Sequence, residues 1–298
     1  METVYIRGFL QQVGAREIIL HSRNFTALFP VGHRRSERFR YRLPRARRPT
    51  RVHDHRWPLG CELLPPPSTT EASPVLKFLT IGHRGVMGVE PENTLRSFVA
   101  AERAGLDAIE LDLHVSRDGA LVVMHDPDVD RTTDGSGTIA DLTLAELRAL
   151  DAGRGERVPV FEEVLDAVTL PLQAEIKDIQ AARVLAEVIR ERDLADRVEV
   201  SSFHDAAVTE MSRLVPGIRT ALIGSRYGLD IVDRAVDAGA ATVCLNLRRL
   251  TLEIVEEARK RDLRIVAWVV NTQEQLRLVH TLELDGVTTD YPGLGGRP

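Results

Sequence analysis

The chain has 298 residues, 43% of them hydrophobic, and a formal net charge of −5. This length suits one large α/β domain or two small ones, and the composition excludes a chain too polar to bury a core. The charge is divided unevenly: residues 1–76 carry 13 Arg, no Lys and 6 acidic residues, a net charge of +7, whereas the remainder carries −12. We therefore expect two regions of different character.

Cys61 and Cys244 are the two cysteines of the sequence, so it contains no disulfide framework and no cysteine-based metal motif. No stretch of 18 or more apolar residues occurs, which excludes an ordinary transmembrane helix. Arg7 and Arg16 interrupt residues 1–20, which therefore lack the apolar core of a secretory signal. We expect a cytoplasmic protein without stable membrane insertion.

Residues 32–70 are rich in Arg and Pro and show neither helical nor strand periodicity. Such a segment buries too little apolar surface to offset its ordering entropy. We expect residues 1–75 to form a leader that is disordered or not part of the catalytic fold. A basic tail for nucleic acid or an anionic membrane is one alternative, and translation from near Val75 or Leu76 is another. No nucleic-acid motif accompanies the leader, so we expect no nucleic-acid partner.

From Leu76 onward, apolar runs alternate with amphipathic stretches. The strand-like runs cover residues 76–81, 108–115 together with 121–125, 171–176, 198–203, 219–223, 241–247, 264–270 and 285–289. The helical patterns, with apolar residues three and four apart, cover residues 93–105, 161–168, 181–193, 205–215, 229–239, 251–262 and 272–283. Counting 108–125 as one hairpin, this alternation predicts an α/β fold, a TIM (β/α)8 barrel, over residues 76–298.

Two details modify this barrel. Residues 126–159 form a small excursion after strand two, and only YPGLGGRP follows strand eight, so the eighth helix should be short or absent. An open doubly wound sheet is the structural alternative. Against it, no GxGxxG or GxxxxGK[ST] motif opens the first helix.

Polar side chains interrupt or follow the apolar runs where βα loops of a barrel converge. They are His83 and Arg84, Glu110 and Asp112, His125 and Asp126, Glu175 and Lys177, Trp268, and Asp290. Residues i and i+2 of a strand face the same side, so Glu110 and Asp112 project together, as do Glu175 and Lys177.

Three acidic side chains on a buried face require positive charge among them. Glu110, Asp112 and Glu175 offer hard oxygen donors, which suit Ca²⁺ or Mg²⁺, with Mn²⁺ as an alternative. For Glu110 and Asp112 alone, a salt-bridged pair is an equally good interpretation; Glu175 and the histidines favour a metal site. His114 shares this face and is either a fourth ligand or, as we favour, a residue at the rim.

The segments IGHRGVMGVEPENTLRSF, AIELDLHVSRDGALVVMHDPDVDRTTDGSG, LQAEIKD, AWVVN and DGVTTDYP resemble the glycerophosphodiester phosphodiesterase family in its short bacterial form. The resemblance spans Leu76 to Pro292 and implies a TIM barrel with a divalent-metal site. It implies these roles: metal ligands Glu110, Asp112 and Glu175; acid/base histidines His83 and His125; phosphate-contacting Arg84 and Lys177; Trp268 lining the pocket; and Glu92 holding Arg84 or approaching the metal.

The resemblance further implies hydrolysis of a small-molecule glycerophosphodiester to sn-glycerol 3-phosphate and an alcohol. The residues agree with such chemistry, because cations stabilise the charge that a phosphodiester gains and histidines transfer protons near neutral pH. The alternatives are a lysophospholipase D-like or other phosphodiesterase acting on lipid headgroups, nucleic-acid binding through the basic leader, and a catalytically inactive metal-binding barrel.

Overall fold

The computed structural model describes residues 9–12, 17–22, 25–30, 78–225 and 228–295. The chain divides into two units, Met1–Val75 and Leu76–Pro298. In the first unit, an antiparallel sheet has the strand order β1 (Phe9–Gln12), β2 (Glu17–Ser22) and β3 (Phe25–Pro30). The Arg- and Pro-rich segment 32–70, for which the sequence predicts no periodic structure, lies outside the described residues.

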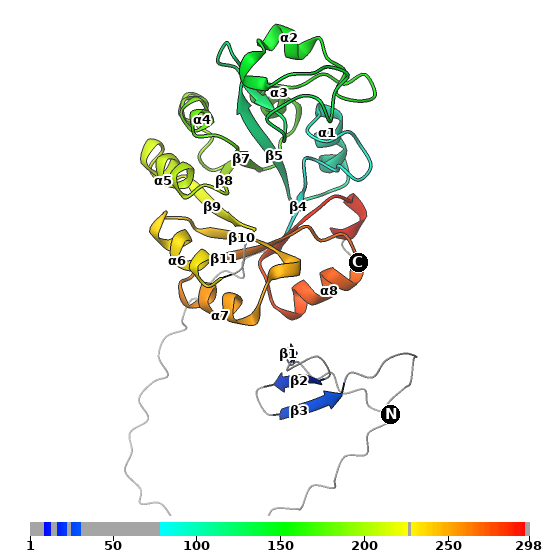
Figure 1. Ribbon diagram of the computed structural model, residues 1–298, viewed down its shortest axis with the longest axis vertical. Coiled ribbons are helices and arrows are strands. Elements are labelled where there is room, and N and C mark those ends of the chain that lie inside the picture. The colour runs from blue at the N-terminus through cyan, green and yellow to red at the C-terminus, as the bar shows by residue number, and fades with distance from the viewer. Residues whose placement is uncertain (1–8, 13–16, 23–24, 31–77, 226–227, 296–298) are drawn as a thin grey trace, which may run out of the picture. The chain divides into compact units, whose positions relative to one another are not determined.

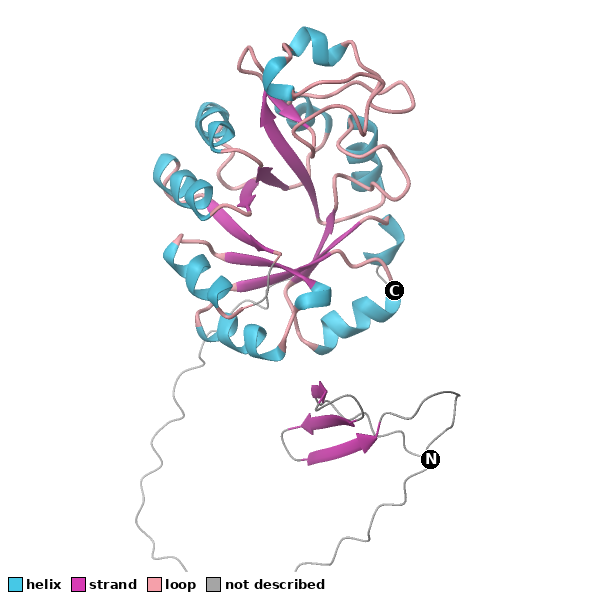
Figure 2. Ribbon diagram, in the orientation of Figure 1, coloured by secondary structure: helices cyan, strands magenta, loops and turns pink. Residues whose placement is uncertain are grey.

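The second unit is the predicted TIM barrel, with the strands at its centre and the helices around them (Figures 1 and 2). The sheet closes because β4 pairs in parallel with both β12 and β5. Each strand overlaps a predicted apolar run. In the described part of this unit the eight parallel strands are β4 (Leu79–Gly82), β5 (Ala108–Val115), β7 (Leu172–Ile176), β8 (Val198–Ser202), β9 (Arg219–Gly224), β10 (Thr242–Asn246), β11 (Arg264–Trp268) and β12 (Gly286–Thr289).

The helices that cover the barrel begin at recognisable caps. Thr94, Thr251 and Thr272 each accept a hydrogen bond from a backbone N–H of the following first turn, as expected for N-cap threonines. Asp178 does the same for two N–H groups. The helices are α1 (Leu95–Arg103), α2 (Leu144–Arg148), α3 (Phe161–Ala167), α4 (Ile179–Glu191), α5 (Asp205–Leu214), α6 (Asp230–Asp237), α7 (Leu252–Lys260) and α8 (Gln273–Thr281).

The chain after β12 agrees with the prediction of a short or absent eighth helix. Within the described residues it forms only the 3-10 helix η3 (Pro292–Gly295). Two further 3-10 helices are η1 (Ile139–Asp141) and η2 (Leu247–Arg249).

The two faces of each barrel strand meet different surroundings. Leu111, Leu113 and Ile176 point outward and join the apolar core that the strands share with the helices. Positions of the opposite parity point into the barrel, and there Glu110, Asp112 and Glu175 replace apolar residues. The parallel register of β5 and β7 sets Asp112 beside Glu175. Strand pairing therefore brings together the carboxylates of Asp112 and Glu175, which are 63 positions apart in the sequence.

The excursion after strand two is a small packed unit. It leaves β6 (Leu121–Val123), which pairs antiparallel with β5 as the predicted hairpin. It contains η1 and α2. Its apolar side chains pack with Val122 and Met124 of the preceding segment in a separate cluster, whose other members are Val129, Ile139, Leu147, Ala152 and Val158. The sequence did not predict α2, which has five residues.

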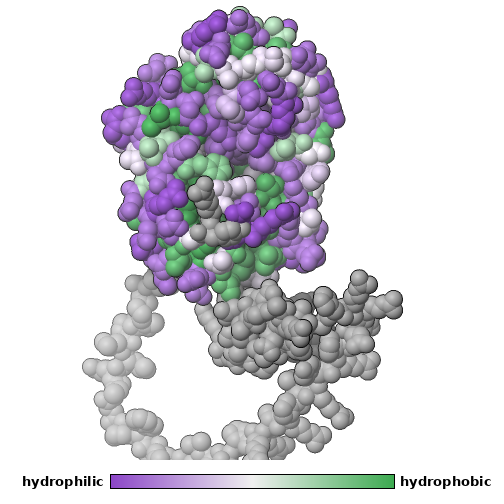
Figure 3. Space-filling view, viewed as in Figure 1, coloured by the Kyte–Doolittle hydropathy of each residue, from purple (hydrophilic) through white to green (hydrophobic). Residues whose placement is uncertain are grey.

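In the described residues, no helix has the length and apolarity needed to cross a membrane. The face seen in Figure 3 is largely hydrophilic, with hydrophobic residues in scattered groups. Among the described residues, the exposed large hydrophobic residues are Val89, Ile179, Leu229, Val236, Leu278 and Tyr291.

Candidate active site

Three carboxylates lie at the centre of the barrel mouth. Glu110 and Asp112 come from β5 and Glu175 from β7, and one oxygen from each lies within 4.8 Å of the others. Their side chains are almost fully buried, with 6%, 1% and 6% of each residue exposed. The predicted acidic set is therefore brought together on neighbouring strands.

Two cations lie against these carboxylates. Lys177 Nζ is 2.9 Å from Asp112 Oδ1 and 2.5 Å from Glu175 Oε1. Arg84 Nε is 3.4 Å from Asp112 Oδ2, and the Arg84 backbone N–H donates to Glu110 Oε2 at 2.9 Å. This backbone contact depends on a tight turn in which Arg84 and Gly85 both have positive φ, 50° and 84°. Both predicted phosphate-contacting cations thus border the acidic cluster.

The charges of the cluster are not balanced. Burial, together with the charges of Asp112 and Glu175, raises the pKa of Glu110 well above its usual value. Burial and the charge of Asp112 raise the pKa of Glu175 to about 7. Burial also acts to raise the pKa of Asp112, but Lys177 and Arg84 outweigh it and hold that pKa below its usual value. Two cations cannot neutralise three buried carboxylates, so the site favours additional positive charge.

A divalent cation fits this donor set. Three clustered carboxylate oxygens are ligands that Ca²⁺, Mg²⁺ and Mn²⁺ prefer. The raised pKa values of Glu110 and Glu175 reflect burial first and repulsion by neighbouring carboxylates second, and a bound cation would offset both. Asn93, the asparagine of the PENT segment, donates from Nδ2 to Asp112 Oδ2 at 2.7 Å. That hydrogen bond orients one of the three carboxylates.

His83 follows β4 and pairs with the end of the last strand. Its Nδ1 lies 2.6 Å from Asp290 Oδ1. Asn271 holds Asp290 in turn, since its Nδ2 donates to Asp290 Oδ2 at 2.5 Å and its Oδ1 accepts from the Asp290 backbone N–H at 2.9 Å. Burial acts to raise the pKa of Asp290, but the hydrogen bonds from His83 and Asn271 lower it overall. An ionised Asp290 only accepts hydrogen bonds, so it keeps the proton on Nδ1 and leaves His83 Nε2 as an acceptor.

His125 repeats this arrangement on the other side. Its Nδ1 lies 2.5 Å from Oδ1 of Asp126, the next residue. Burial lowers the pKa of His125 despite the opposing effects of Asp112 and Asp126. His114 is buried, not at the rim, and its Nε2 lies 3.1 Å from the His125 backbone oxygen. Our preferred interpretation of His114 as a rim residue is therefore wrong, and it contacts the backbone of a candidate acid/base histidine.

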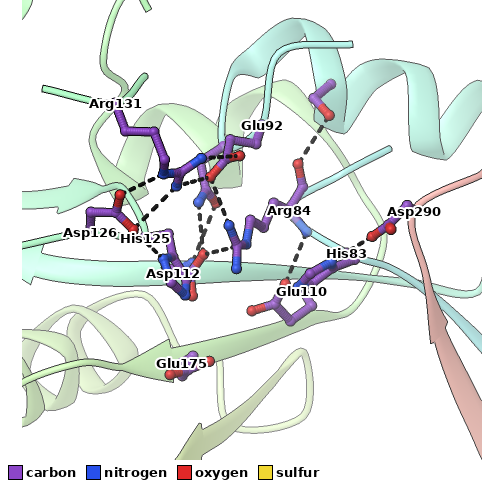
Figure 4. Close-up of polar contacts among 12 residues, drawn as sticks. His83, Arg84, Glu92, Glu110, Asp112, His125, Asp126, Arg131, Glu175 and Asp290 are labelled. Carbon is purple, nitrogen blue, oxygen red and sulfur yellow. Dashed lines mark hydrogen bonds and ion pairs between the residues drawn. The ribbon is translucent and has the colours of Figure 1, made fainter. Parts of the chain in front are cut away.

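Glu92 links the two sides of the site through Arg84 and Arg131 (Figure 4). Arg84 Nη1 donates to Glu92 Oε1 at 2.8 Å, which is the first of the two alternatives expected for Glu92, holding Arg84 or approaching the metal. Arg131, from the excursion, donates to both Glu92 oxygens and to both Asp126 oxygens. These four residues form a continuous charged network beside the carboxylates.

A pocket of about 160 Å³ opens above the carboxylates. His83, Arg84, His125 and Lys177 line it together with Glu110 and Glu175. The other lining residues are Gln173 of β7, Thr288 of β12, and Phe203, Ile223, Cys244 and Trp268 from the region of β8 to β11. Trp268 lies edge-on to Phe203, with ring centroids 5.9 Å apart, and its Nε1 donates to the Cys244 backbone oxygen at 3.1 Å. The pocket thus has one charged wall and one largely apolar wall.

Several residues of this site were not assigned roles from the sequence. Asn93, Arg131 and Asn271 lie in loops, so strand parity carries no information about them. Asp126 and Asp290 were noted by position, but their pairing with the histidines was not predicted. The sequence feature that could have indicated these roles is their position: Asp126 directly follows His125 in the HD segment, and Asp290 directly follows the last strand in the TDYP segment.

The sequence model of the glycerophosphoryl diester phosphodiesterase family matches residues 83–294. A glycerophosphodiester phosphodiesterase of Caldanaerobacter subterraneus is 32% identical over 235 residues, covering 73% of this chain and 96% of the relative. One from Bacillus subtilis is 30% identical over 253 residues, covering 73% and 85%.

Solved structures agree with these sequence matches. A phosphodiesterase of Oleispira antarctica in complex with the product sn-glycerol-3-phosphate superimposes with a TM-score of 0.68 at 28% identity, covering 72% of this chain and 93% of that one. A Thermotoga maritima glycerophosphodiester phosphodiesterase gives 0.65 at 27% identity, covering 73% and 96%. The barrel, its buried acidic cluster and these matches show that the chain is a phosphodiesterase belonging to the glycerophosphoryl diester phosphodiesterase family.

Proposed function

We propose that this enzyme hydrolyses glycerophosphodiesters to sn-glycerol 3-phosphate and an alcohol in a reaction that depends on a divalent metal ion. The observation that carries the proposal is a pocket lined by two aspartate-paired histidines and by two carboxylates of a buried cluster of three. Acid/base groups, a cation site and phosphate-binding cations are the parts that phosphodiester hydrolysis requires.

Glu110, Asp112 and Glu175 would hold the metal ion, which we propose to be Ca²⁺ or Mg²⁺, with Mn²⁺ as an alternative. When bound, the ion would offset the surplus negative charge of the three carboxylates and would withdraw electron density from the phosphoryl group. The three carboxylates belong to residues of hydrogen-bonded strands, which restricts their movement.

Arg84 and Lys177 would bind the phosphoryl oxygens. Both line the pocket and both are held at the acidic cluster by Asp112. Their pKa values are raised overall, because the neighbouring carboxylates outweigh the opposing effect of burial. They therefore remain charged through the working pH range and stabilise the charge that builds up on the phosphoryl oxygens in the transition state.

His83 and His125 would transfer the protons. Each has Nδ1 bound to an aspartate, which leaves Nε2 for the pocket. One imidazole accepts the proton of the attacking hydroxyl as its oxygen bonds to phosphorus, and the other imidazolium protonates the departing alkoxide as its bond to phosphorus breaks. With the glycerol 2-hydroxyl as nucleophile, a cyclic phosphate forms and water then opens it with the proton transfers reversed. The net change is the addition of one water.

The pocket favours a small substrate group. Its volume of about 160 Å³ is below the range of about 300–1,000 Å³ typical for drug-sized ligands. Trp268, Phe203 and Ile223 provide an apolar wall against which the carbon chain of glycerol can lie. We propose the glycerol phosphate portion as the group bound here, with the alcohol toward solvent.

We also propose that residues 76–298 hold the complete catalytic unit and that the enzyme works in the cytoplasm. The site residues all belong to the second unit. The sequence has two cysteines, one in each region, and so no disulfide framework, which suits a reducing compartment.

The direct test is release of sn-glycerol 3-phosphate from several glycerophosphodiesters, first with EDTA and then with added Ca²⁺, Mg²⁺ or Mn²⁺. We expect no turnover in EDTA and recovery with at least one metal. The variants Glu110→Gln and His83→Ala should be inactive while remaining folded. Inactivity of the wild-type protein on every glycerophosphodiester with every metal would overturn the proposal, as would full activity of either variant.

A further inference from the structure

Arg131 makes an unusual number of directed contacts for a half-exposed side chain. Its Nε and Nη2 donate to Asp126 Oδ2 and Oδ1 at 2.5 and 3.2 Å. Its Nη1 and Nη2 donate to Glu92 Oε2 and Oε1 at 2.8 and 2.7 Å. One planar guanidinium is therefore shared by two carboxylates, each held through both of its oxygens (Figure 4).

Each of these carboxylates also holds a side chain of the pocket. Asp126 Oδ1 is bound to His125 Nδ1 at 2.5 Å, and Glu92 Oε1 is bound to Arg84 Nη1 at 2.8 Å. His125 and Arg84 come from separate loops, and Arg131 is the connection between their two carboxylate partners.

We propose that Arg131 is a positioning residue that fixes the side chains of His125 and Arg84 relative to each other, so that the proton-transfer group and the phosphate-binding group keep the spacing that the reaction needs. The proposal rests on the roles of His125 and Arg84 in the proposed function. Arg131 itself does not line the pocket, so it acts through Asp126 and Glu92.

Charge explains why the connection is needed. Asp126 and Glu92 would repel each other across the site if no cation lay between them. Without Arg131, Asp126 would be left with His125 alone and Glu92 with Arg84 alone, and each carboxylate would be free to draw its partner away from the pocket. A displacement of about 1 Å at a reacting group can cost about 10²-fold in rate.

The geometry also requires arginine. A guanidinium presents donors along two edges in a fixed plane, whereas an ammonium is a compact charge without that fork. Lysine at position 131 can neutralise one carboxylate but cannot hold both through paired hydrogen bonds. Because the side chain of Arg131 is 46% exposed, we expect a small effect on stability and a large one on catalysis.

The test compares Arg131→Ala and Arg131→Lys with Arg154→Ala. Arg154 belongs to the same excursion and also binds a carboxylate, Glu90, at 2.5 Å, but Glu90 holds no side chain of the pocket. We expect Arg131→Ala to lower kcat/KM about 10- to 100-fold, with Arg131→Lys restoring little and Arg154→Ala unchanged. Added guanidinium ion should partly restore Arg131→Ala, and ammonium ion should not.

Double-mutant cycles separate positioning from a merely structural role. Asp126→Asn should act mainly on kcat and Glu92→Gln mainly on KM, and each should cost less in the Arg131→Ala background than in the wild type. Additive effects, wild-type activity of Arg131→Ala, or a loss that parallels a fall in melting temperature would each overturn the proposal.

A readout independent of the substrate keeps this test distinct from that of the proposed function. The short hydrogen bond to Asp126 should give His125 a downfield Nδ1–H resonance in NMR spectra, which should shift or broaden in Arg131→Ala and persist in Arg154→Ala. The kinetic measurements on these variants can use bis(p-nitrophenyl) phosphate, a phosphodiester that contains no glycerol. An unchanged His125 resonance would contradict positioning by Arg131 even if glycerophosphodiesters prove not to be the substrates.

Discussion

His83 and Asp290 join the first and last strands of the barrel, with His83 Nδ1 2.6 Å from Asp290 Oδ1. Closure of the barrel brings these residues together. β12 pairs with β4, His83 directly follows β4, and Asp290 directly follows β12. The orientation of one candidate acid/base histidine thus depends on completion of the barrel.

The first prediction concerns this pair. Asp290→Asn should lower kcat by about 10²- to 10⁴-fold, because an amide can donate to Nδ1 and favour the tautomer with its proton on Nε2. The measurement is kcat with a glycerophosphodiester, alongside the melting temperature. In the His83→Ala background the same substitution should have little further effect. Equal losses in both backgrounds would show that Asp290 acts independently of His83.

The second prediction concerns pH and metal. Because the pKa of Glu175 is raised to about 7, the metal-free folded state binds more protons than the unfolded chain between about pH 4.5 and about pH 7, and the raised pKa of Glu110 acts in the same direction. These groups should therefore make the free energy of unfolding fall as pH rises through this window. A bound divalent ion competes with those protons, so it should stabilise the protein more above pH 7 than below it. Calorimetry with and without metal tests both statements.

A double substitution provides the control for that experiment. Glu110→Gln with Glu175→Gln should flatten this part of the pH dependence and remove the stabilisation by metal. Persistence of a metal-induced shift in the melting temperature would place the cation elsewhere.

The third prediction separates phosphate binding from metal binding. Lys177→Met removes the ammonium that neutralises Asp112 and Glu175, so affinity for the divalent ion should stay the same or increase, while kcat falls by about 10-fold or more. Isothermal titration with Ca²⁺ or Mg²⁺ and steady-state kinetics measure the two effects. Lys260→Met, on the exposed surface of α7, is the matched control. A large loss of metal affinity in Lys177→Met would mean that Lys177 supports the ligands themselves.

The fourth prediction concerns the leader. Deletion of residues 1–75 should leave kcat/KM unchanged, because the site residues belong to the second unit and the family match begins at residue 83. The comparison requires the full chain and the truncated chain at equal metal concentration. A lower KM for the full chain would show that the leader contributes to substrate binding.

The barrel could be predicted from the sequence because its strands are buried on both faces and read as apolar runs. The acidic cluster could be predicted for a related reason: Glu110 and Asp112 are out of place in such a run, and strand parity fixes the side to which they point. The helix α2 was missed because five residues are too few to establish a helical period.

The contacts between loops were not predictable in the same way. Arg131 and Glu92 are separated by 39 positions, and Asn271 and Asp290 by 19, and no periodicity relates them. His114 shows the same limit, since parity gave its direction but not the His125 carbonyl that it meets.

The excursion has its own small apolar cluster, separate from the main cores of the barrel. A unit of this size can open locally at a lower free energy than the whole domain. Because Arg131 belongs to the excursion, each such opening would slow catalysis while the barrel stays folded. Turnover should therefore fall under conditions that leave the global unfolding transition unchanged.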